Sequence, residues 1–105
     1  MWKIEYLREA LEDIKQLDQG QRVQVVKAIN KAAVNPLPQN EGGYGKPLGK
    51  KGDTNLTGYC KIKLLKLGLR VVYHLVREHN SMRIIVVSAR ADDEVYLLAQ
   101  KRKEE

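Results

Sequence analysis

The stretch that decides the fold is Lys61-Ile-Lys-Leu-Leu-Lys-Leu-Gly-Leu-Arg-Val-Val-Tyr73, in which cationic and aliphatic residues alternate on both sides of a short break. Alternate side chains of a strand point to the same face, so Lys61 and Lys63 share one face of the first half. The break is a four-residue loop, a common hairpin length, and it ends on Gly68, where the backbone must reverse. We therefore predict a β-hairpin in which Lys63 lies opposite Arg70.

This register also decides what the two faces of the hairpin carry. It pairs Leu64 with Leu69 and Ile62 with Val71, so one face is apolar and the other carries three cations. Like charges placed opposite each other destabilise a sheet. Stability alone gives no reason for such a patch, whereas a bound polyanion would give one. The hairpin therefore predicts an anion-binding surface.

Positive charge is concentrated in this part of the chain. Residues 46–70 hold seven Lys and Arg against Asp53 alone, an excess equal to the whole formal net charge of +6. A localised basic patch is typical of proteins that bind nucleic acid or phosphate. A solvated basic loop would give the same count, so charge alone leaves both interpretations open.

Length and composition favour one folded domain over residues 1–105. Hydrophobic residues make up 43% of the chain and charged residues 30%, an ordinary balance for a folded protein. No apolar run approaches the length of a membrane span, and the acidic residues near the N-terminus argue against a secretion signal. The single cysteine, Cys60, cannot form an internal disulfide, which fits a cytoplasmic protein.

Periodicity predicts a short strand followed by two helices. Alternation over residues 2–6 indicates the strand, and apolar residues three or four apart indicate a helix from Arg8. The sequence Asp18-Gln-Gly20 separates it from a second helix that ends near Asn35, ahead of two prolines. So short a break predicts an antiparallel helical hairpin. The residues expected to face the core from the second helix are Val23, Val26, Ile29 and Ala33.

Residues 36–57 show no useful periodicity and are rich in glycine. Lys46, Lys50 and Lys51 could follow a phosphate backbone, but a flexible connector between helices and sheet is the favoured interpretation.

The last part of the chain predicts a third apolar strand at 82–87, followed by Arg90 and a final helix. Asp92 can cap this helix, and cations fill its last turn. Its expected inner stripe is Val95, Leu98, Ala99 and Arg102. The order β-α-α-β-β-β-α predicts an α+β fold, with a small antiparallel sheet packed against the helical hairpin and a C-terminal helix.

The cationic face suits chemistry on a phosphodiester. Cleaving RNA without a metal requires a base for the 2′-hydroxyl, an acid for the leaving oxygen and positive charge for the phosphorane. Lys61, Lys63 and Arg70 supply charge, and Arg90 and Tyr96 could reach them from the strand end and the final helix. Tyr96 could stack on a base, although its spacing alone favours a core tyrosine on an amphipathic helix.

Other candidates are weaker. Cys60 falls on the apolar face and reads as a small buried residue, and His74 lies too far from Arg70 to share one phosphate with it. His79 sits in a turn. The acidic run 92–94 could suggest a metal site, but helix capping explains it, so we expect no metal and no other cofactor.

An ordered set of motifs resembles a known family. Gly58-Tyr-Cys-Lys-Ile-Lys-Leu64, Gly68-Leu-Arg-Val-Val-Tyr73, Ile85-Val-Val-Ser-Ala-Arg90 and Glu94-Val-Tyr96, with Ala99-Gln-Lys-Arg102 after it, are similar to the RelE branch of the RelE/ParE toxins of type II toxin–antitoxin systems. Ala89 departs from the pattern, because some relatives carry a cation there. The long glycine-rich loop also exceeds that of the shortest relatives.

The resemblance implies a ribosome-dependent endoribonuclease that cleaves mRNA codons in the A site by attack of the 2′-hydroxyl. It assigns the catalytic positions to Lys61, Lys63, Arg70, Arg90 and Tyr96, with a lysine moving protons and the general base left open. It also implies two partners, a cognate antitoxin, RelB-like or another DNA-binding antitoxin, and the ribosome with its mRNA. A ParE-like gyrase inhibitor of the same fold and a non-catalytic RNA-binding protein remain as alternatives.

Overall fold

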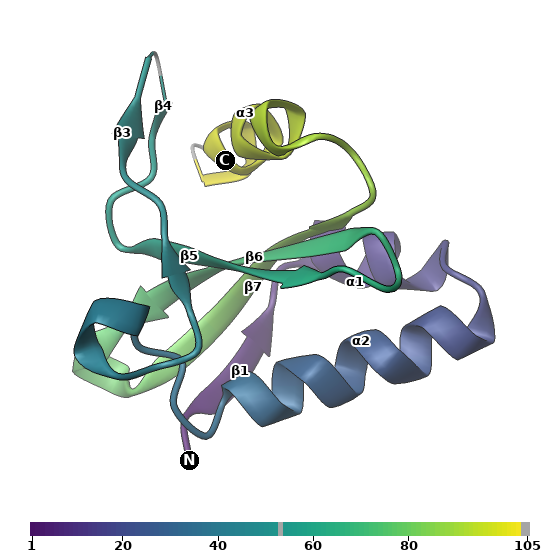
Figure 1. Ribbon diagram of the computed structural model, residues 1–105, viewed down its shortest axis with the longest axis horizontal. Helices are drawn as coiled ribbons and strands as arrows, with labels where there is room; N and C mark the ends of the chain where they lie inside the picture. Colours follow the sequence, from purple (N-terminus) through teal and green to yellow (C-terminus); the bar gives the residue numbers. More distant parts are fainter. Residues whose placement is uncertain (53, 104–105) are drawn as a thin grey trace.

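The fold is a five-stranded sheet with α2 on one side and α3 on the other (Figure 1). The structure is a computed structural model and describes residues 1–52 and 54–103. The strand order is β1-β7-β6-β5-β2, and β3 and β4 form a separate two-stranded arm. The elements in chain order are β1 (Lys3–Tyr6), α1 (Arg8–Lys15), α2 (Gln19–Ala32), the 3-10 turn η1 (Gln39–Glu41), β2 (Lys46–Pro47), β3 (Lys50–Lys51), β4 (Thr54–Asn55), β5 (Tyr59–Leu64), β6 (Leu69–Val76), η2 (Arg77–His79), β7 (Ser81–Ser88) and α3 (Asp92–Lys103).

The α+β class and the order of the long elements are confirmed. The sheet is mixed rather than fully antiparallel, because β1 runs parallel to β7 with Lys3 beside Ser81. These two strands are joined through most of the chain, so no hairpin constrains their direction. Helices also cover both faces of the sheet, since α3 packs on the face opposite α1 and α2.

The predicted hairpin register is confirmed at each pair. Lys63 lies beside Arg70, Ile62 beside Val71 and Leu64 beside Leu69. Gly68 closes the turn with a φ of +66°, in the left-handed region that residues with a Cβ rarely adopt. The alternation of the strand therefore fixes which side chains reach each face.

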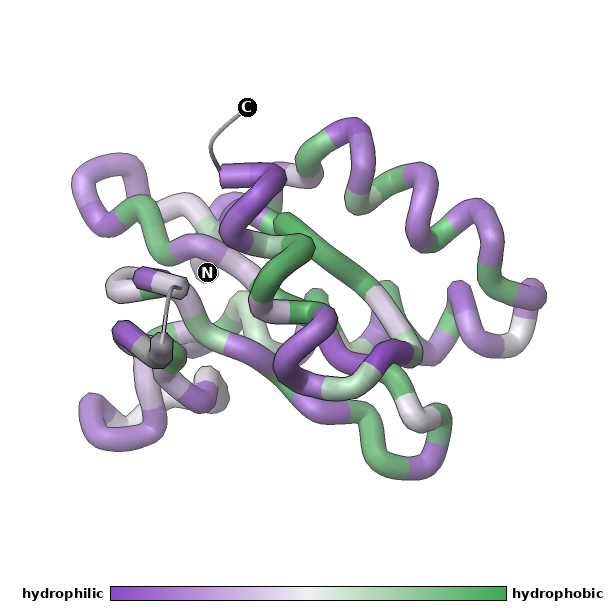
Figure 2. Tube along the Cα trace, turned by 90° about the horizontal axis from the view of Figure 1, so that it is seen from above, coloured by the Kyte–Doolittle hydropathy of each residue, from purple (hydrophilic) through white to green (hydrophobic). Residues whose placement is uncertain are grey.

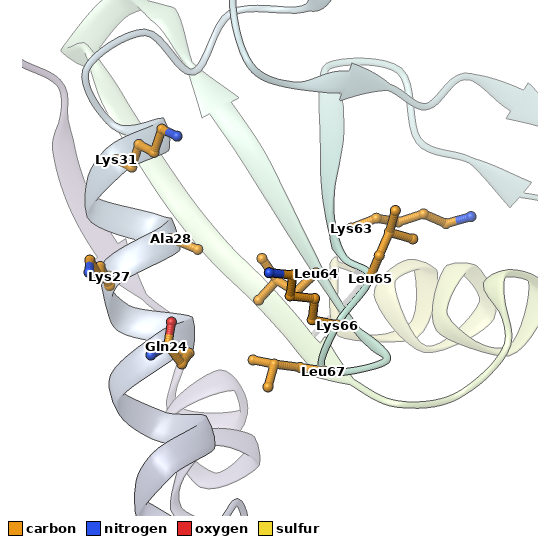
Figure 3. A pocket seen from close by; sticks show the side chains of 9 residues that line it. All are labelled: Gln24, Lys27, Ala28, Lys31, Lys63, Leu64, Leu65, Lys66 and Leu67. Atoms are coloured by element: carbon orange, nitrogen blue, oxygen red, sulfur yellow. The ribbon is translucent and has the colours of Figure 1, made fainter.

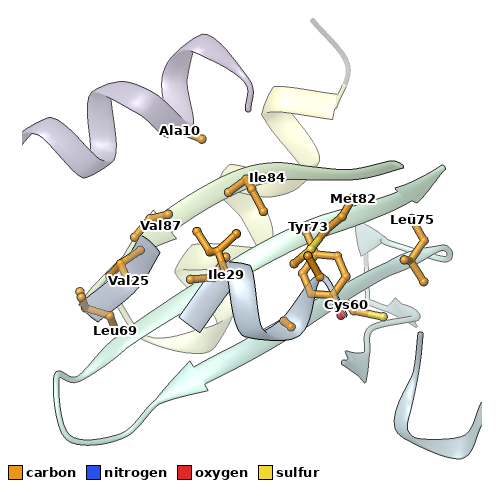
Figure 4. Close-up of a cluster of buried hydrophobic side chains, with 13 residues drawn as sticks. Ala10, Val25, Ile29, Cys60, Leu69, Tyr73, Leu75, Met82, Ile84 and Val87 are labelled. Carbon is orange, nitrogen blue, oxygen red and sulfur yellow. The ribbon is translucent and has the colours of Figure 1, made fainter. Parts of the chain in front are cut away.

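Two apolar clusters lie on the two faces of the sheet. The cluster under α1 and α2 includes Val25, Ile29, Tyr73 and Ile84, all fully buried (Figure 4). The cluster under α3 is built around Val72, Val86, Val95 and Ala99. Figure 2 shows the hydrophobic residues running through the centre of the molecule, with hydrophilic residues along the helices that flank it. None of the helices in the described part of the chain combines the length and the apolar character that a membrane span requires.

The expected core face of α2 was wrong in part. Val25 and Ile29 are fully buried, whereas Val23 is 56% exposed and Val26 is 37% exposed. Valines at 23, 25 and 26 surround much of the helix, so helical spacing fits two stripes equally well. The start of the helix is set by Asp18, whose carboxylate accepts a hydrogen bond from the backbone N–H of Gln21 in a capping box.

The segment from Pro36 to Gly45 is packed rather than a featureless connector. The buried Tyr73 hydroxyl donates a hydrogen bond to the carbonyl of Pro36, at 2.6 Å. Gly45 lies so close to this hydroxyl that a Cβ there would approach it to 2.2 Å. Directly after Gly45, β2 pairs with β5. The loop is therefore held against the sheet up to the point where Lys46 enters it.

Side chains from α1 and α3 meet at the outer edge of β7, beyond the end of β1. The sheet register shifts near Val72, leaving Ile85 without a partner on β6. Arg102 donates a hydrogen bond to the Ile85 carbonyl and two more to Asp13, while Asp13 accepts one from the backbone N–H of Val87. The Asp13–Arg102 ion pair thus provides hydrogen-bond partners for the backbone of the irregular part of β7 and anchors the end of α3.

We expect Arg102→Ala to lower the free energy of unfolding by about 2–4 kcal/mol, because it leaves the mostly buried Asp13 carboxylate without its cation. Urea denaturation followed by circular dichroism measures this loss. Lys101→Ala is the matched control, since Lys101 is exposed on the same turn. Equal unfolding midpoints for the two variants would contradict the anchoring role of the pair.

Candidate functional site

Four of the five candidate residues lie together on the face of the sheet that α3 covers. Lys61 and Lys63 come from β5, Arg70 from β6 and Tyr96 from the second turn of α3. The Lys61 side chain is only 4% exposed, whereas that of Lys63 is 39% exposed. The site therefore has a desolvated centre and an open side.

Asp92 lies at the centre of this cationic cluster. Its Oδ2 is 3.2 Å from the Lys61 ammonium and 3.6 Å from the Lys63 ammonium, and its Oδ1 accepts a hydrogen bond from Arg70 Nε. The prediction that Asp92 caps α3 was wrong. The carbonyl of Ala91 accepts the first helical hydrogen bond, from Val95, so Asp92 is the first residue inside the helix.

The cations around Asp92 change its acidity. Burial alone would raise the pKa of this carboxyl, but hydrogen bonds from Lys61 and Arg70 and the charges of both cations outweigh burial. The pKa of Asp92 therefore lies below its ordinary value, and the carboxyl is ionised at neutral pH. The three cations are neutralised in part by a single internal anion.

Tyr96 is held at the site by Lys61. The ammonium of Lys61 donates a hydrogen bond to the Tyr96 hydroxyl at 2.6 Å and lies 5.2 Å from the centre of the ring. This contact fixes one edge of the ring, and the rest of the ring lines a groove. The spacing of Tyr96 favoured a core tyrosine, and this is confirmed in part. Tyr96 packs against the apolar cluster under α3 and also lines the groove at the cationic face.

Arg90 joins the cluster through its backbone. Its carbonyl accepts a hydrogen bond from Arg70 Nη1 at 2.7 Å. Its exposed guanidinium makes no ion pair with any residue that the structure describes. The structure thus brings Arg90 to the edge of the site and leaves its side chain available to a ligand.

A groove of about 360 Å³ runs beside the cluster, between α3 and the segment that carries β2 and β3. The residues that line it include Lys61, Asp92, Tyr96, Lys46 and Lys50. Lys46 lies directly beside Lys61 in the β2–β5 pair, so both side chains leave the same face of the sheet. The register that brings Lys46 to the site could not be found from the sequence, because the pattern of the loop has no period.

The remaining candidates have structural roles. Cys60 is 1% exposed, and burial raises the pKa of its thiol to about 11, so it is protonated at neutral pH. His74 stacks on Tyr59 with ring centres 4.4 Å apart, and burial followed by the charge of Arg83 lowers the pKa of its imidazole. In the described part of the chain, no group of three or more His, Cys, Asp or Glu is arranged to hold a metal ion.

A second groove, of about 420 Å³, lies on the other side of the β5–β6 hairpin (Figure 3). It runs between α2 and the hairpin loop, where Leu65 is 82% exposed. Lys63 extends away from α2, while Leu67 points toward it (Figure 3). The rim of this groove carries Lys27, Lys31 and Lys66.

The cluster has the chemistry of a phosphate site. Arg70 offers a planar donor set, and Lys61 and Lys63 act as point charges on neighbouring positions of one rigid strand. Three cations converging on one anion, with a phenol and a second arginine at the edge, can bind a phosphodiester and stabilise added negative charge on it.

The class defined by this fold and site is an α+β domain with a cationic centre on the face of its sheet beneath the C-terminal helix. No protein-family model matches the chain. A curated relative from Escherichia coli described as a RelE-like toxin protein is 29% identical over 101 residues, which is 96% of each chain.

Solved structures show the same likeness. The isolated E. coli RelE toxin superposes with a TM-score of 0.70 at 24% identity, covering 98% of this chain and 99% of that one. A double arginine-to-alanine mutant of E. coli RelE in the free state gives 0.75 at 26% identity, with 96% of each chain covered. The toxin–antitoxin complex RelBE2 from Mycobacterium tuberculosis gives 0.57 at 21% identity, covering 85% and 98%. The resemblance to RelE-type toxins is therefore confirmed in both sequence and fold.

The lowered pKa of Asp92 predicts a pH dependence of stability. A carboxyl with a depressed folded-state pKa contributes stability that is complete above its unfolded pKa of about 4 and is lost as the pH falls through the folded value. We expect wild type to be more stable than Asp92→Asn at pH 7 and this advantage to be smaller at pH 3, because the carboxylate begins to lose its contribution as the pH falls below about 4. Chemical denaturation at both pH values measures the difference, with Asp93→Asn as the control for one lost negative charge.

Proposed function

We propose that this protein is the toxin of a type II toxin–antitoxin system and acts in the cytoplasm as an endoribonuclease on mRNA in the ribosomal A site. The observation that carries the proposal is the convergence of Lys61, Lys63 and Arg70 on one anion, Asp92, beside a groove that Tyr96 lines. A single sheet face thus holds the charge that a scissile phosphate requires. The likeness to RelE-type toxins supports the choice of RNA as substrate.

The proposed reaction uses the RNA 2′-hydroxyl as nucleophile and needs no metal. The 2′-oxygen gives its proton to a general base and attacks the adjacent phosphorus, and a pentacovalent phosphorane forms. The bond to the 5′-oxygen then breaks as that oxygen takes up a proton, which gives a cyclic phosphate and a 5′-hydroxyl. Arg70 and the two lysines neutralise charge on the phosphorane, and Arg90 contacts the scissile phosphate from the strand end. Lys61 is one candidate for moving a proton, because its ammonium lies deepest in the site.

Tyr96 and Lys46 are proposed to hold the nucleotides on either side of the reacting phosphate. The Tyr96 ring lines the groove with its hydroxyl fixed by Lys61, which leaves a ring surface for a base to stack on. Lys46 lines the same groove from β2, beside Lys61, and is exposed, so it is placed for a flanking phosphate. Positioning of this kind aligns the attacking and leaving oxygens.

The partner proposed for the free toxin is an antitoxin. Solved structures similar to this chain include the E. coli RelBE toxin–antitoxin complex and a RelE mutant bound to an antitoxin peptide. The groove beside α2 has an apolar floor and a lysine rim, which suits an acidic amphipathic segment. We propose that the antitoxin covers this groove or the cationic face.

The double variant Lys61→Ala/Arg70→Ala tests the nuclease. We expect its cleavage of translated mRNA to fall by about 1,000-fold or more, because two of the three charges on the phosphorane are lost. Primer extension on a message translated in a purified system measures the cleavage. The control is Lys3→Ala/Arg8→Ala, which removes the same two charge types from exposed positions in β1 and at the start of α1.

Four outcomes would contradict the nuclease. Intact message in the presence of folded wild-type protein excludes it, as does equal cleavage by the two double variants. Inhibition of supercoiling by purified DNA gyrase, without RNA cleavage, would favour the ParE-like alternative. Salt-sensitive RNA binding with no strand scission would favour the alternative of a non-catalytic RNA-binding protein.

Two substitutions separate the roles of the Tyr96 ring and hydroxyl. Tyr96→Phe keeps the stacking surface and loses the Lys61 hydrogen bond, so we expect a moderate fall in the cleavage rate, by about tenfold. Tyr96→Ala also removes the stacking surface, so we expect its cleavage rate to be at least about tenfold lower than that of Tyr96→Phe. Single-turnover primer extension compares them, and equal rates for Phe and Ala would exclude stacking.

A further inference from the structure

We propose that Asp92 occupies the place of a ligand phosphate in the free protein, so that a phosphate binds the cationic cluster only by displacing this carboxylate. Only the identity of the ligand as RNA rests on the proposed function. The competition itself concerns only an anion and the cluster of Lys61, Lys63 and Arg70.

The contacts of Asp92 are those that a phosphate would make. One carboxylate oxygen meets the Arg70 guanidinium, and the other lies between the two ammonium groups, at 3.2 Å from Lys61 and 3.6 Å from Lys63. Two oxygens of a phosphodiester require the same donors. A second anion cannot share these donors with Asp92, because two negative charges at hydrogen-bonding distance from the same cations repel each other.

The burial of Lys61 makes an exchange of anions more favourable than simple loss of one. Its side chain is 4% exposed, and a desolvated ammonium without a counterion is costly. The cluster therefore holds an anion in either state, the internal carboxylate or an external phosphate. Lys61 keeps its hydrogen bond to the Tyr96 hydroxyl on its other side.

Asp92 is well placed to leave. Its side chain is 36% exposed, and it lies at the first residue of α3. The first helical hydrogen bond runs from Val95 to the carbonyl of Ala91 and does not involve the Asp92 side chain. A rotation of that side chain toward solvent therefore opens the site without breaking the helix.

Competition with Asp92 makes the site selective for ligands that also make contacts outside the cationic cluster. The apparent affinity of an anion is its affinity for the open site multiplied by the fraction of time that the site is open, so a site closed nine-tenths of the time binds about tenfold more weakly. A free anion has only the cluster to compensate for this loss. A phosphodiester within a bound strand has additional contacts, for example with Lys46 and Tyr96 along the groove.

Titration with inorganic phosphate tests the proposal on the full chain. The dissociation constant is measured by NMR from the lysine ammonium and backbone signals of β5 and β6, at constant ionic strength. We expect Asp92→Asn to bind phosphate about tenfold more tightly than wild type. Asp93→Asn removes the same charge one residue further on, from an exposed side chain whose carboxylate accepts a hydrogen bond from the backbone N–H of Glu94, and should bind as wild type does.

Equal or weaker binding by Asp92→Asn would overturn the proposal, because Asp92 would then only support the fold. A second measurement needs no variant. In wild type saturated with phosphate, the carboxyl ¹³C signal of Asp92 should move toward that of a solvated aspartate while that of Asp93 stays unchanged. An unmoved Asp92 signal, with shifted lysine signals, would also overturn it. Neither readout involves RNA cleavage, so a failed nuclease assay would not affect this proposal. A failed phosphate titration would likewise not affect the proposed nuclease activity.

Discussion

Mutual repulsion among three cations is the constraint on which this structure depends. Lys63 and Arg70 are paired directly across two strands, and Lys61 lies on the same face two residues earlier. A sheet carries such a patch at a cost unless an anion lies within it. Asp92 supplies the anion, and it comes from a different element, so the electrostatics of the sheet face and the position of α3 cannot be considered apart.

The rest of the fold supports both sides of this contact. The β5–β6 hairpin sets the cations in register, and the apolar cluster behind it keeps the strands rigid. At its other end, α3 is anchored by Arg102, which binds Asp13 of α1 and the carbonyl at the irregular point of β7. The helix is thus fixed at both ends by charge and along its length by Val95 and Ala99. This double attachment holds Tyr96 over the site.

Local pattern predicted the parts of this arrangement that depend on neighbours in sequence. Alternation gave the pairing of Lys63 with Arg70, and parity put Cys60 on the buried face. Long-range choices were not accessible in this way. The parallel pairing of β1 with β7 and the approach of Lys46 to Lys61 depend on how distant segments meet.

Asp92 shows most clearly why the site could be predicted only in part. An aspartate before an amphipathic segment satisfies the rule for a helix cap, and that rule uses only local sequence. Three cations 22 to 31 residues earlier compete for the same carboxylate, and their combined attraction exceeds that of one backbone N–H. Since Asp92 is part of α3, any ligand that takes its place changes what holds the start of that helix. By linkage, if a ligand binds more tightly when the start of α3 has moved and so changes the affinity of the cluster for an anion, the anion changes the affinity of that ligand by the same factor.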